Sequence, residues 1–450
     1  MKDRIPVNPG RVRITPEDGS AAFYATMTRA DNPTQEGDPL NKATLLKDAT
    51  AKRFGLDASA VPDDVLNKIC TKMHEYGEIG DFMITARKDL GDRWLLCNGE
   101  SISPSEYPEL AEFIRGVSGQ TIGSAVNLLK IAHYNGTWVA VGYDSSGSSD
   151  YPYIFATTDP TGTWTGAKIS TTSAVIRDIY CHNGTWVAVG ADNSNPYPYI
   201  WTTTDPFGSW TQKRIATSYV YLHGIYCHDG TWVAVGYRNS SYYPYIYIAT
   251  DPTGTWTEKS IGSAACYLNS ITYQNGTWVA SGSYGGKVYI YTATDPTGTW
   301  TSKALSLSAS FTSSKMICHN GVFVIAGYSG NYPYILTTSD LTGKWVEKQL
   351  STGKIQLNDI AAYNGSYVAV GSAIGINTPY YFTADDPSGD WVEHSLPGTV
   401  LLYGVSYEEG TWVAVGYDGS ENPYIFCDSY YLLPAISLDK AYAYIKALEG

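Results

Sequence analysis

The chain has 450 residues and a formal net charge of -13; 16% of its residues are charged and 14% are aromatic. The acidic balance argues against a surface for nucleic acid or for an anionic membrane. No apolar run reaches membrane-spanning length, and the start Met1-Lys-Asp-Arg-Ile-Pro is not a secretory signal. We therefore expect a protein that is made in a cytoplasm, does not insert into membranes and has more than one domain.

The first 116 residues predict a hairpin and several helices. Residues 11–15 and 22–26 flank a Pro-Glu-Asp-Gly turn, which predicts a short hairpin. A first helix is expected at 38–55, with Asp38 as N-cap and a stop at glycine, and a second at 62–76. A capping box begins a third at 103–114. The apolar stripe of the second helix predicts either packing on the first helix or a seam between identical subunits.

From residue 135 onward one octapeptide, Asn135-Gly-Thr-Trp-Val-Ala-Val-Gly142, recurs at intervals of 44 to 48 residues. Its first glycine falls at Gly136, Gly184, Gly230, Gly276, Gly321, Gly365 and Gly410. Each copy carries four strand-like segments rich in aromatic and β-branched residues, separated by Asn-Gly, Asp-Gly or Asp-Pro-x-Gly turns. Four strands in each of seven repeats predict a mainly β fold, a seven-bladed β-propeller.

The last repeat lacks a fourth strand, and a segment before the first repeat supplies a candidate. Residues 120–125, Gln-Thr-Ile-Gly-Ser-Ala, match Lys-Ser-Ile-Gly-Ser-Ala at 259–264, which is a fourth strand and its exit loop. We expect the last blade to take three strands from about 401–428 and its fourth from about 117–124. Closure by both ends of the insert would remove the exposed edges of an open ring.

A turn motif accompanies six of the blades. Thr158-Asp-Pro-Thr-Gly-Thr-Trp164 recurs at Asp205, Asp251, Asp295 and Asp386, and more loosely at Asp340. It resembles the Asp-box of sialidase-type propellers, which shapes the turn between the third and fourth strands, although the glycine here stands one place later. The two junctions of the insert fall where the seventh such turn would be.

The segments that flank the propeller carry a second resemblance. Trp94-Leu-Leu-Cys-Asn-Gly-Glu-Ser-Ile-Ser-Pro-Ser-Glu-Tyr-Pro-Glu-Leu110 resembles the opening of the phage tail-collar domain, and 433–446 resembles the end of such tail-fibre proteins. Residues 27–31 and 38–50 look like the amino-terminal attachment region of tail proteins from phages of Gram-positive bacteria. The resemblance implies an N-terminal tail-attachment hairpin at 1–36, a helical neck at 37–77, a small α+β tail-collar domain split between 78–116 and 429–450, and an inserted propeller at 117–428.

Three Cys-His pairs, at 181–182, 227–228 and 318–319, occupy one strand position in three blades. Such pairs can suggest a metal site, but equivalent positions rotate away from each other around a ring, whereas zinc ligands must lie within about 2.3 Å of one ion. Shared repeat ancestry explains them better. We expect no metal, no cofactor and no structural disulfide.

A sialidase-like enzyme would need clustered arginines for a substrate carboxylate, together with an acid and a nucleophile. Between residues 120 and 430 there are three arginines, Arg177, Arg214 and Arg238, in different strand or loop contexts. The aspartates of the turn motif recur in six blades, so we interpret them as structural. The sequence therefore predicts no catalytic residue and no enzyme. A glycan depolymerase, a sialidase-like glycoside hydrolase, is the alternative.

The loops between second and third strands vary while the strands stay constant. They are rich in Tyr, Ser, Gly and Asn, the composition of antibody paratopes, although solvated turns share it. The recurrent tyrosine of the third strand, present in all seven blades, is attributed to the fold. The ligand-binding candidates are Tyr151, Asn193, Asn195, Tyr197, Tyr219, Tyr221, Arg238, Tyr242, Tyr243, Tyr267, Tyr284, Asn331, Tyr332, Asn377 and Asn422.

These observations predict a phage or prophage tail-tip receptor-binding protein, located in the virion and synthesised in the bacterial cytoplasm. Its propeller would bind a host cell-surface receptor, with a glycan favoured by the tyrosines. Residues 1–77 would contact other tail proteins, and the collar resemblance implies a homotrimer. A purely structural tail component is a further alternative, but it leaves the loop composition without a role.

Overall fold

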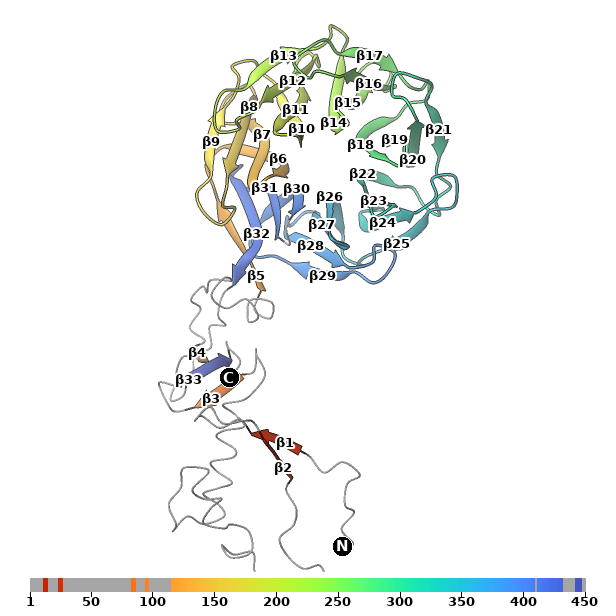
Figure 1. Ribbon diagram of the computed structural model, residues 1–450. Coiled ribbons are helices and arrows are strands. Elements are labelled where there is room, and N and C mark those ends of the chain that lie inside the picture. The colour runs from red at the N-terminus through yellow and green to blue at the C-terminus, as the bar shows by residue number, and fades with distance from the viewer. Residues whose placement is uncertain are drawn as a thin grey trace, which may run out of the picture. The chain divides into compact units, whose positions relative to one another are not determined.

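The computed structural model describes residues 115–408 and 411–431, and five short strands outside them. The chain divides into two compact units, Met1–Ile114 with Leu432–Gly450, and Arg115–Tyr431 (Figure 1). The described residues contain no helix, and so none that could span a membrane. The helices predicted at 38–55, 62–76 and 103–114 lie outside the described residues.

Strands of the smaller unit form two sheets. β1 (Arg11–Ile14) pairs with β2 (Phe23–Thr26) in antiparallel fashion, as the predicted hairpin requires. β33 (Tyr442–Lys446) lies between β3 (Phe82–Thr85) and β4 (Trp94–Leu96) in a three-stranded sheet. Segments from before and after the propeller therefore share one sheet. The domain boundaries and the collar assignment remain predictions.

The larger unit consists of seven four-stranded antiparallel sheets arranged as a ring, which confirms the seven-bladed β-propeller (Figure 1). Blade 1 comprises β6 (Val126–Tyr134), β7 (Thr137–Asp144), β8 (Tyr151–Thr157) and β9 (Thr165–Lys168); blade 2 comprises β10 (Val175–His182), β11 (Thr185–Ala191), β12 (Pro198–Thr203) and β13 (Thr211–Arg214); blade 3 comprises β14 (Val220–His228), β15 (Thr231–Arg238), β16 (Pro244–Ala249) and β17 (Thr257–Ser260); blade 4 comprises β18 (Tyr267–Gln274), β19 (Thr277–Tyr284), β20 (Lys287–Ala293) and β21 (Thr301–Ala304); blade 5 comprises β22 (Thr312–His319), β23 (Val322–Ser329), β24 (Tyr332–Thr338) and β25 (Val346–Gln349); blade 6 comprises β26 (Ile355–Tyr363), β27 (Ser366–Ala373), β28 (Pro379–Ala384) and β29 (Val392–Ser395); blade 7 comprises β30 (Val400–Glu408), β31 (Thr411–Asp418), β32 (Pro423–Tyr431) and β5 (Arg115–Thr121).

Blade 7 is closed by the two ends of the propeller segment. β5 pairs antiparallel with β32, with Thr121 opposite Tyr424 and Ser118 opposite Cys427. This is the pairing that the matching hexapeptides predict. Because the fourth strand of the last blade comes from the start of the segment, no blade has to be completed by a separate element, and the ring has no open seam.

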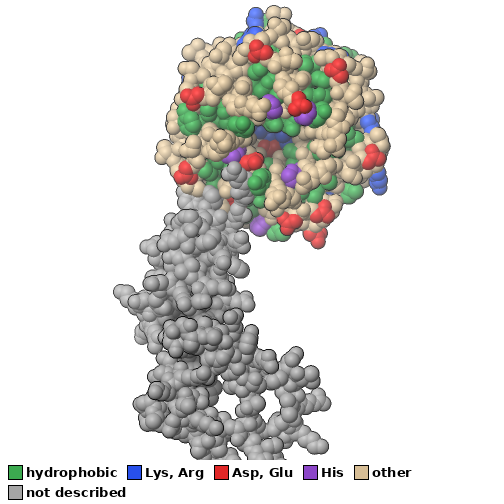
Figure 2. All heavy atoms as spheres, in the orientation of Figure 1, with side chains coloured by type: hydrophobic (Ala, Val, Ile, Leu, Met, Phe, Trp, Pro, Cys, Tyr) green, Lys and Arg blue, Asp and Glu red, His purple; other side chains and the backbone are tan. Residues whose placement is uncertain are grey.

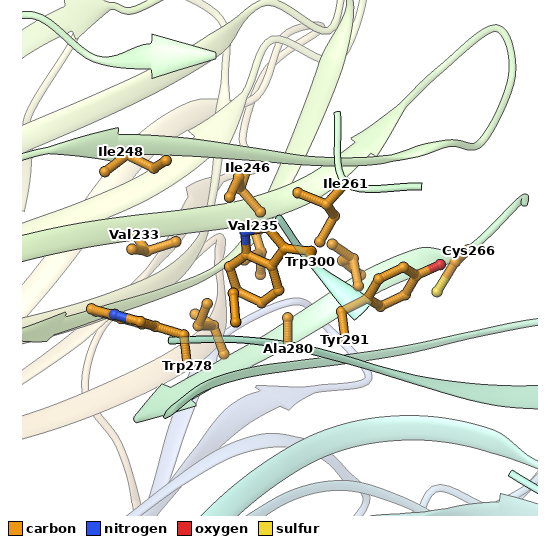
Figure 3. Close-up of a cluster of buried hydrophobic side chains, with 13 residues drawn as sticks. Val233, Val235, Ile246, Ile248, Ile261, Cys266, Trp278, Ala280, Tyr291 and Trp300 are labelled. Atoms are coloured by element: carbon orange, nitrogen blue, oxygen red, sulfur yellow. The ribbon is translucent and has the colours of Figure 1, made fainter. Parts of the chain in front are cut away.

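The first strands of all seven blades line a central channel, visible as a hollow in the all-atom view (Figure 2). The second strands, which carry the octapeptide, form the core between blades. Their alternation sends Val233 and Val235 into the interface with blade 4, beside Trp278, whereas Ala234 faces blade 2. Figure 3 shows this interface, with Tyr291 completing it. Burying one such Val side chain contributes about 1.5–3 kcal/mol, so the Val-Ala-Val of five blades packs against both neighbouring blades; the segment is Val-Ala-Ser in blade 4 and Val-Ile-Ala in blade 5.

Two backbone devices explain the constant residues of the octapeptide. Asn135 and Gly136 both adopt positive φ, 47° and 75°, as the tight hairpin turn requires. Gly142 lies against the preceding strand, where a Cβ would be 1.9 Å from the carbonyl oxygen of Asn127. Beside that close contact the first strand carries a β-bulge, between Leu128 and Lys130.

The bulge recurs in the first strand of every blade. It leaves one residue per blade without a partner in the strand register: Leu129, Arg177, His223, Asn269, Ser314, Asn358 and Tyr403. Three of these clamp the next blade. Asn269, Ser314 and Asn358 each donate to a backbone carbonyl of the following first strand, all at 2.6 Å.

The turns between third and fourth strands are held by a repeated set of bonds. The Asp159 carboxylate accepts from the Thr161 amide at 2.9 Å, and the indole N–H of Trp164 donates to the Pro160 carbonyl at 3.2 Å. Fourth-strand lysines then join blades: Lys303 donates to three carbonyls of the turn of blade 5, at 2.7–3.2 Å. Lys213, Lys259 and Lys348 make equivalent contacts.

Candidate ligand-binding face

The up-and-down strand order gives the propeller two unlike faces. The Asn-Gly turns and the Asp-Pro turns lie on one, which we call the turn face. The loops between second and third strands lie on the other, the loop face, together with the connections from each fourth strand to the next first strand. Backbone bonds join these two kinds of loop: Ala174 donates to the carbonyl of Asp150 at 2.9 Å, and Cys266 to that of Tyr242 at 2.8 Å.

Four tyrosines gather on the loop face of blades 3 and 4. Tyr242, from the loop of blade 3, packs against Tyr267 at the start of β18 and Tyr284 at the end of β19, with ring centroids 5.3 and 5.7 Å away. Tyr267 and Tyr284 are 5.3 Å apart, and Tyr237, at the end of β15, lies 4.6 Å from Tyr267. We call these four residues the tyrosine cluster.

The cluster is unusual because its rings stay exposed. Tyr242, Tyr267 and Tyr284 retain 38%, 37% and 37% of their accessible surface although they pack together. Contiguous exposed aromatic surface marks binding sites. The rings meet edge to face or tilted, so some ring faces point to solvent.

The backbone that carries Tyr242 is held in an uncommon conformation. Tyr242 has a φ of 57°, in the left-handed region, which a bulky residue rarely adopts. Its amide donates to the Arg238 carbonyl at 2.7 Å, and its own carbonyl accepts from Cys266. Such strain persists only where surrounding structure enforces it, and it concentrates at functional sites.

A second aromatic group lies on blades 2 and 3. Tyr197 and Tyr219 stack obliquely at 5.1 Å, and the Arg214 guanidinium lies 4.8 Å from the Tyr197 ring. Tyr219 is 47% exposed. A hydrogen bond between the two hydroxyls raises the pKa of Tyr219. This pair offers a second stacking surface.

The inner rim of the loop face, around the channel, holds the predicted candidate Tyr221 and two residues that the sequence reasoning missed, His223 and Tyr237. His223 stacks on Tyr237 at 5.3 Å, and Tyr221 packs beside both. Burial, with the nearby charge of Arg177, lowers the pKa of His223 to about 3, so its imidazole is neutral. Tyr237 follows the last glycine of the octapeptide. The corresponding residue is Tyr in blades 1, 3, 5 and 7, but Ala191, Ser283 and Ser372 in the even blades. This alternation along the sequence is the signal from which the inner rim could have been found.

The remaining candidates do not join either aromatic group within the described residues. The Lys168 ammonium covers the Tyr151 ring at 3.3 Å. Arg238 pairs with Glu258 at 3.1 Å and covers Tyr245, so its guanidinium already has partners inside the blade. Several others have local positions: Asn193 bonds Asp150, Asn195 lies in a turn held by Asp192, Asn331 and Asn377 adopt positive φ, Asn422 bonds Asp418, Tyr332 begins β24, and Tyr243 is exposed.

On the turn face the channel opens into a cavity of about 680 Å³ lined by first-strand residues. Figure 2 shows histidines around this hollow, with charged side chains inside it. Two buried ion pairs cross the channel, Lys130–Asp359 at 2.7 Å and Lys315–Asp178 at 3.3 Å. Both carboxylates also accept a backbone N–H of the next blade, at 3.1 Å for Asp178 and 2.9 Å for Asp359. This internal pairing indicates a structural role for the four charges.

Cys181, Cys227 and Cys318 are free, and the described part of the chain contains no group of three or more residues that could hold a metal ion. Burial raises the pKa of Cys181 to about 12, so this thiol stays protonated at neutral pH.

No family model matches the chain, and no curated protein matches it. Among solved structures it is similar to one titled "Phage phi92 endosialidase", with a TM-score of 0.45 and 10% sequence identity, over 72% of this chain and 70% of that one.

That finding contradicts the prediction that the chain is not an enzyme, because the similar structure is by its title an enzyme. The prediction that the chain is not an enzyme is therefore withdrawn. It rested mainly on the arginines, and the spacing of one residue type along the chain does not show which other residues a propeller brings together near its axis. Arg177 of blade 2 acts electrostatically on Tyr143 of blade 1 and Tyr237 of blade 3. Linear spacing does not reveal such convergence.

Proposed function

We propose that this chain is a phage or prophage tail protein whose propeller binds a cell-surface glycan through the loop face. The tyrosine cluster carries the proposal. Tyr rings present broad amphipathic faces at low entropic cost, and their hydroxyls can bond to sugar hydroxyl groups. The Tyr197–Tyr219 pair gives a second contact of the same kind, as an extended polymer would need.

The two ends of the propeller segment meet at one place in blade 7. β5 begins and β32 ends in one pair, Arg115 opposite Tyr431, at the end of blade 7 that corresponds to the turn face. Both ends of the propeller segment therefore lie at the opposite end of the blade from the loops between second and third strands. The resemblance of 94–110 and 433–446 to tail-collar proteins, and of the Asp-Pro turns to Asp-boxes, supports placing this protein in a phage tail.

The test is glycan and cell binding by variants of the cluster. Tyr242→Ala, Tyr267→Ala and Tyr284→Ala should each weaken binding by about 1–3 kcal/mol. Tyr134→Ala is the matched control, because Tyr134 is equally exposed, at 38%, but is the last residue of β6 and lies at the turn-face end of blade 1. Binding of purified protein to host cells, and to an array of bacterial surface glycans, would be measured. Equal loss in the control and cluster variants would refute the assignment.

Cleavage of the bound glycan is the second candidate function. The Tyr143 phenol lies in the field of two carboxylates, Asp150 and Glu421, and of Arg177. Carboxylates are the groups that glycoside hydrolases use as acid, base and nucleophile. New reducing ends released from a bound polysaccharide, and their loss in Asp150→Asn or Glu421→Gln, would support cleavage; an intact polymer after prolonged incubation would argue against it.

Attachment and assembly belong to the same proposal. Residues 1–77 would contact other tail proteins, and the chain would form a homotrimer through 1–116 and 429–450. The trimer is inferred from the tail-fibre resemblance. Light scattering of the full chain at micromolar concentration tests it, and a monomer mass would refute it.

A further inference from the structure

The turn between third and fourth strands carries a tryptophan that fills one place at the junction with the preceding blade. In blade 4 this residue is Trp300, which is buried. It lies in one cluster with four side chains, all labelled in Figure 3: Val233, Ile246, Ile248 and Trp278. The first three belong to blade 3, and Trp278 belongs to the second strand of blade 4. The other five blades with this turn place their tryptophans in the same way: Trp164, Trp210, Trp256, Trp345 and Trp391.

Blade 7 lacks this tryptophan, although its surroundings are formed. The residues after Asp428 do not contain the turn motif, and no tryptophan follows Trp412 in the sequence. The strand registers give the counterparts of the four side chains around Trp300, in the same order: Val368, Tyr381, Thr383 and Trp412. All four line a cavity of about 340 Å³ between blades 6 and 7, which we call the junction cavity. The two blades therefore form the place that a seventh tryptophan would fill.

The walls of the junction cavity are aromatic. The Tyr381 ring lies 4.8 Å from the Trp412 ring and stacks on His394, with ring centroids 4.4 Å apart and an angle of 10° between the planes. His394 occupies the fourth-strand position of Lys259, which donates to the turn of blade 4. A flat ring therefore replaces the residue that would hold a seventh turn. Aromatic rings pack favourably edge to face or offset against another ring.

The charged groups of the cavity are negative. Among its described lining residues there is no lysine or arginine, and the acidic ones are Asp385, Asp390 and Asp428. Like charges repel across such short distances. The lining therefore disfavours an anionic ligand and fits a ring that is uncharged.

We propose that the junction cavity binds a tryptophan side chain of a partner polypeptide, which completes the junction of blades 6 and 7 from outside. Six tryptophans of this chain fill the equivalent places, and each of them is carried on a turn of the polypeptide. Val117 of β5 and Asp428 of β32 also line the cavity, so the partner would contact the propeller beside the two strands at its ends. The inference concerns the turn face and goes beyond the proposed glycan binding.

The probe is a capped hexapeptide, Pro-Thr-Gly-Thr-Trp-Thr, with the sequence of residues 252–257. It carries no charge, and it includes the proline carbonyl that accepts the indole N–H of Trp256 at 3.0 Å in blade 3. The comparison peptide has Trp256→Ala. The full chain should bind the tryptophan peptide about ten- to a hundredfold more tightly, as burial of one large apolar side chain predicts.

Two variants of the full chain locate the binding. Thr383→Phe places a ring in the junction cavity and should abolish the preference for the tryptophan peptide. Thr301→Phe is the matched control, because it adds the same ring at an exposed position on the fourth strand of blade 4, and it should keep the preference.

Ligand-observed NMR titration of each peptide would measure the affinities, and melting temperature would check that the variants fold. Equal binding of the two peptides by the wild type, or an undiminished preference in Thr383→Phe, would overturn the inference. So would a wild-type chain that binds neither peptide, because its own residues would then fill the cavity. The outcome is separable from that of the proposed function, since peptide binding should survive Tyr242→Ala and glycan binding should survive Thr383→Phe.

Discussion

Replacing Asp359 with alanine should destabilise the propeller more than any single truncation at its surface. The Asp359 side chain is 3% exposed, and it contacts the Lys130 ammonium at 2.7 Å and the Val405 amide at 2.9 Å. Alanine would leave a buried cation and a backbone N–H without their partners. Breaking one side of a buried pair costs about 3–5 kcal/mol. Burial already lowers the pKa of Lys130, the sign of an environment that disfavours its charge.

The double variant separates pairing from packing. Lys130→Met with Asp359→Asn removes both charges but keeps an acceptor for the Val405 N–H, so it should cost only about 1–2 kcal/mol relative to the wild type. Urea unfolding followed by tryptophan fluorescence would give the midpoints and slopes. If Asp359→Ala unfolds at the same urea concentration as the double variant, the unpaired cation is not the source of the cost, and the reasoning fails.

Three further outcomes follow from contacts described above. Lys303→Met removes three bonds to carbonyls of blade 5 and should cost about 1–3 kcal/mol by urea unfolding, whereas the exposed Lys287→Met should change little. Gly236→Ala should prevent native closure of blade 3, because its Cβ would lie 1.8 Å from a carbonyl oxygen; Gly419→Ala, with open space around it, should fold, and equal yields and melting temperatures would count against this. Burial raises the pKa of Cys266 to about 12, so the folded state holds this proton more tightly than the unfolded state, whose thiol pKa is near 9. The contribution of Cys266 to the free energy of unfolding is therefore complete below pH 9 and declines as pH rises towards 12. A free energy of unfolding that increases between about pH 9 and 11 would contradict that sign.

The fold was predictable because its determinants are local and repeated. Turns such as Asn135–Gly136 mark strand ends, and the repeated Val-Ala-Val marks strands that are buried on both sides. Even the closure of blade 7 followed from a short match between residues 120–125 and 259–264. These signals act within about ten residues, where strand and turn preferences are decided.

The site was predictable only in part. Composition identified Tyr242, Tyr267 and Tyr284 as candidates, but it could not distinguish them from Arg238, whose guanidinium is bound by Glu258. At the inner rim only Tyr221 was among the candidates, and Arg177, His223 and Tyr237 were missed. Arg177 stands at a β-bulge of the first strand. A bulge changes the direction of a side chain, and no particular residue type at that position predicts it.

The alternation at the end of the second strand has a consequence for the ring as a whole. Odd blades place tyrosine there and even blades place a small residue. Two kinds of residue can alternate strictly around a closed ring only when the number of blades is even, and this ring has seven. Two blades of one kind must therefore meet once. They are blades 7 and 1, where Tyr417 lies in the field of Tyr143 and where the chain enters and leaves through β5 and β32. This single break in the alternation makes the junction of blades 7 and 1 different from every other junction on the loop face, so each blade has a distinct position relative to it.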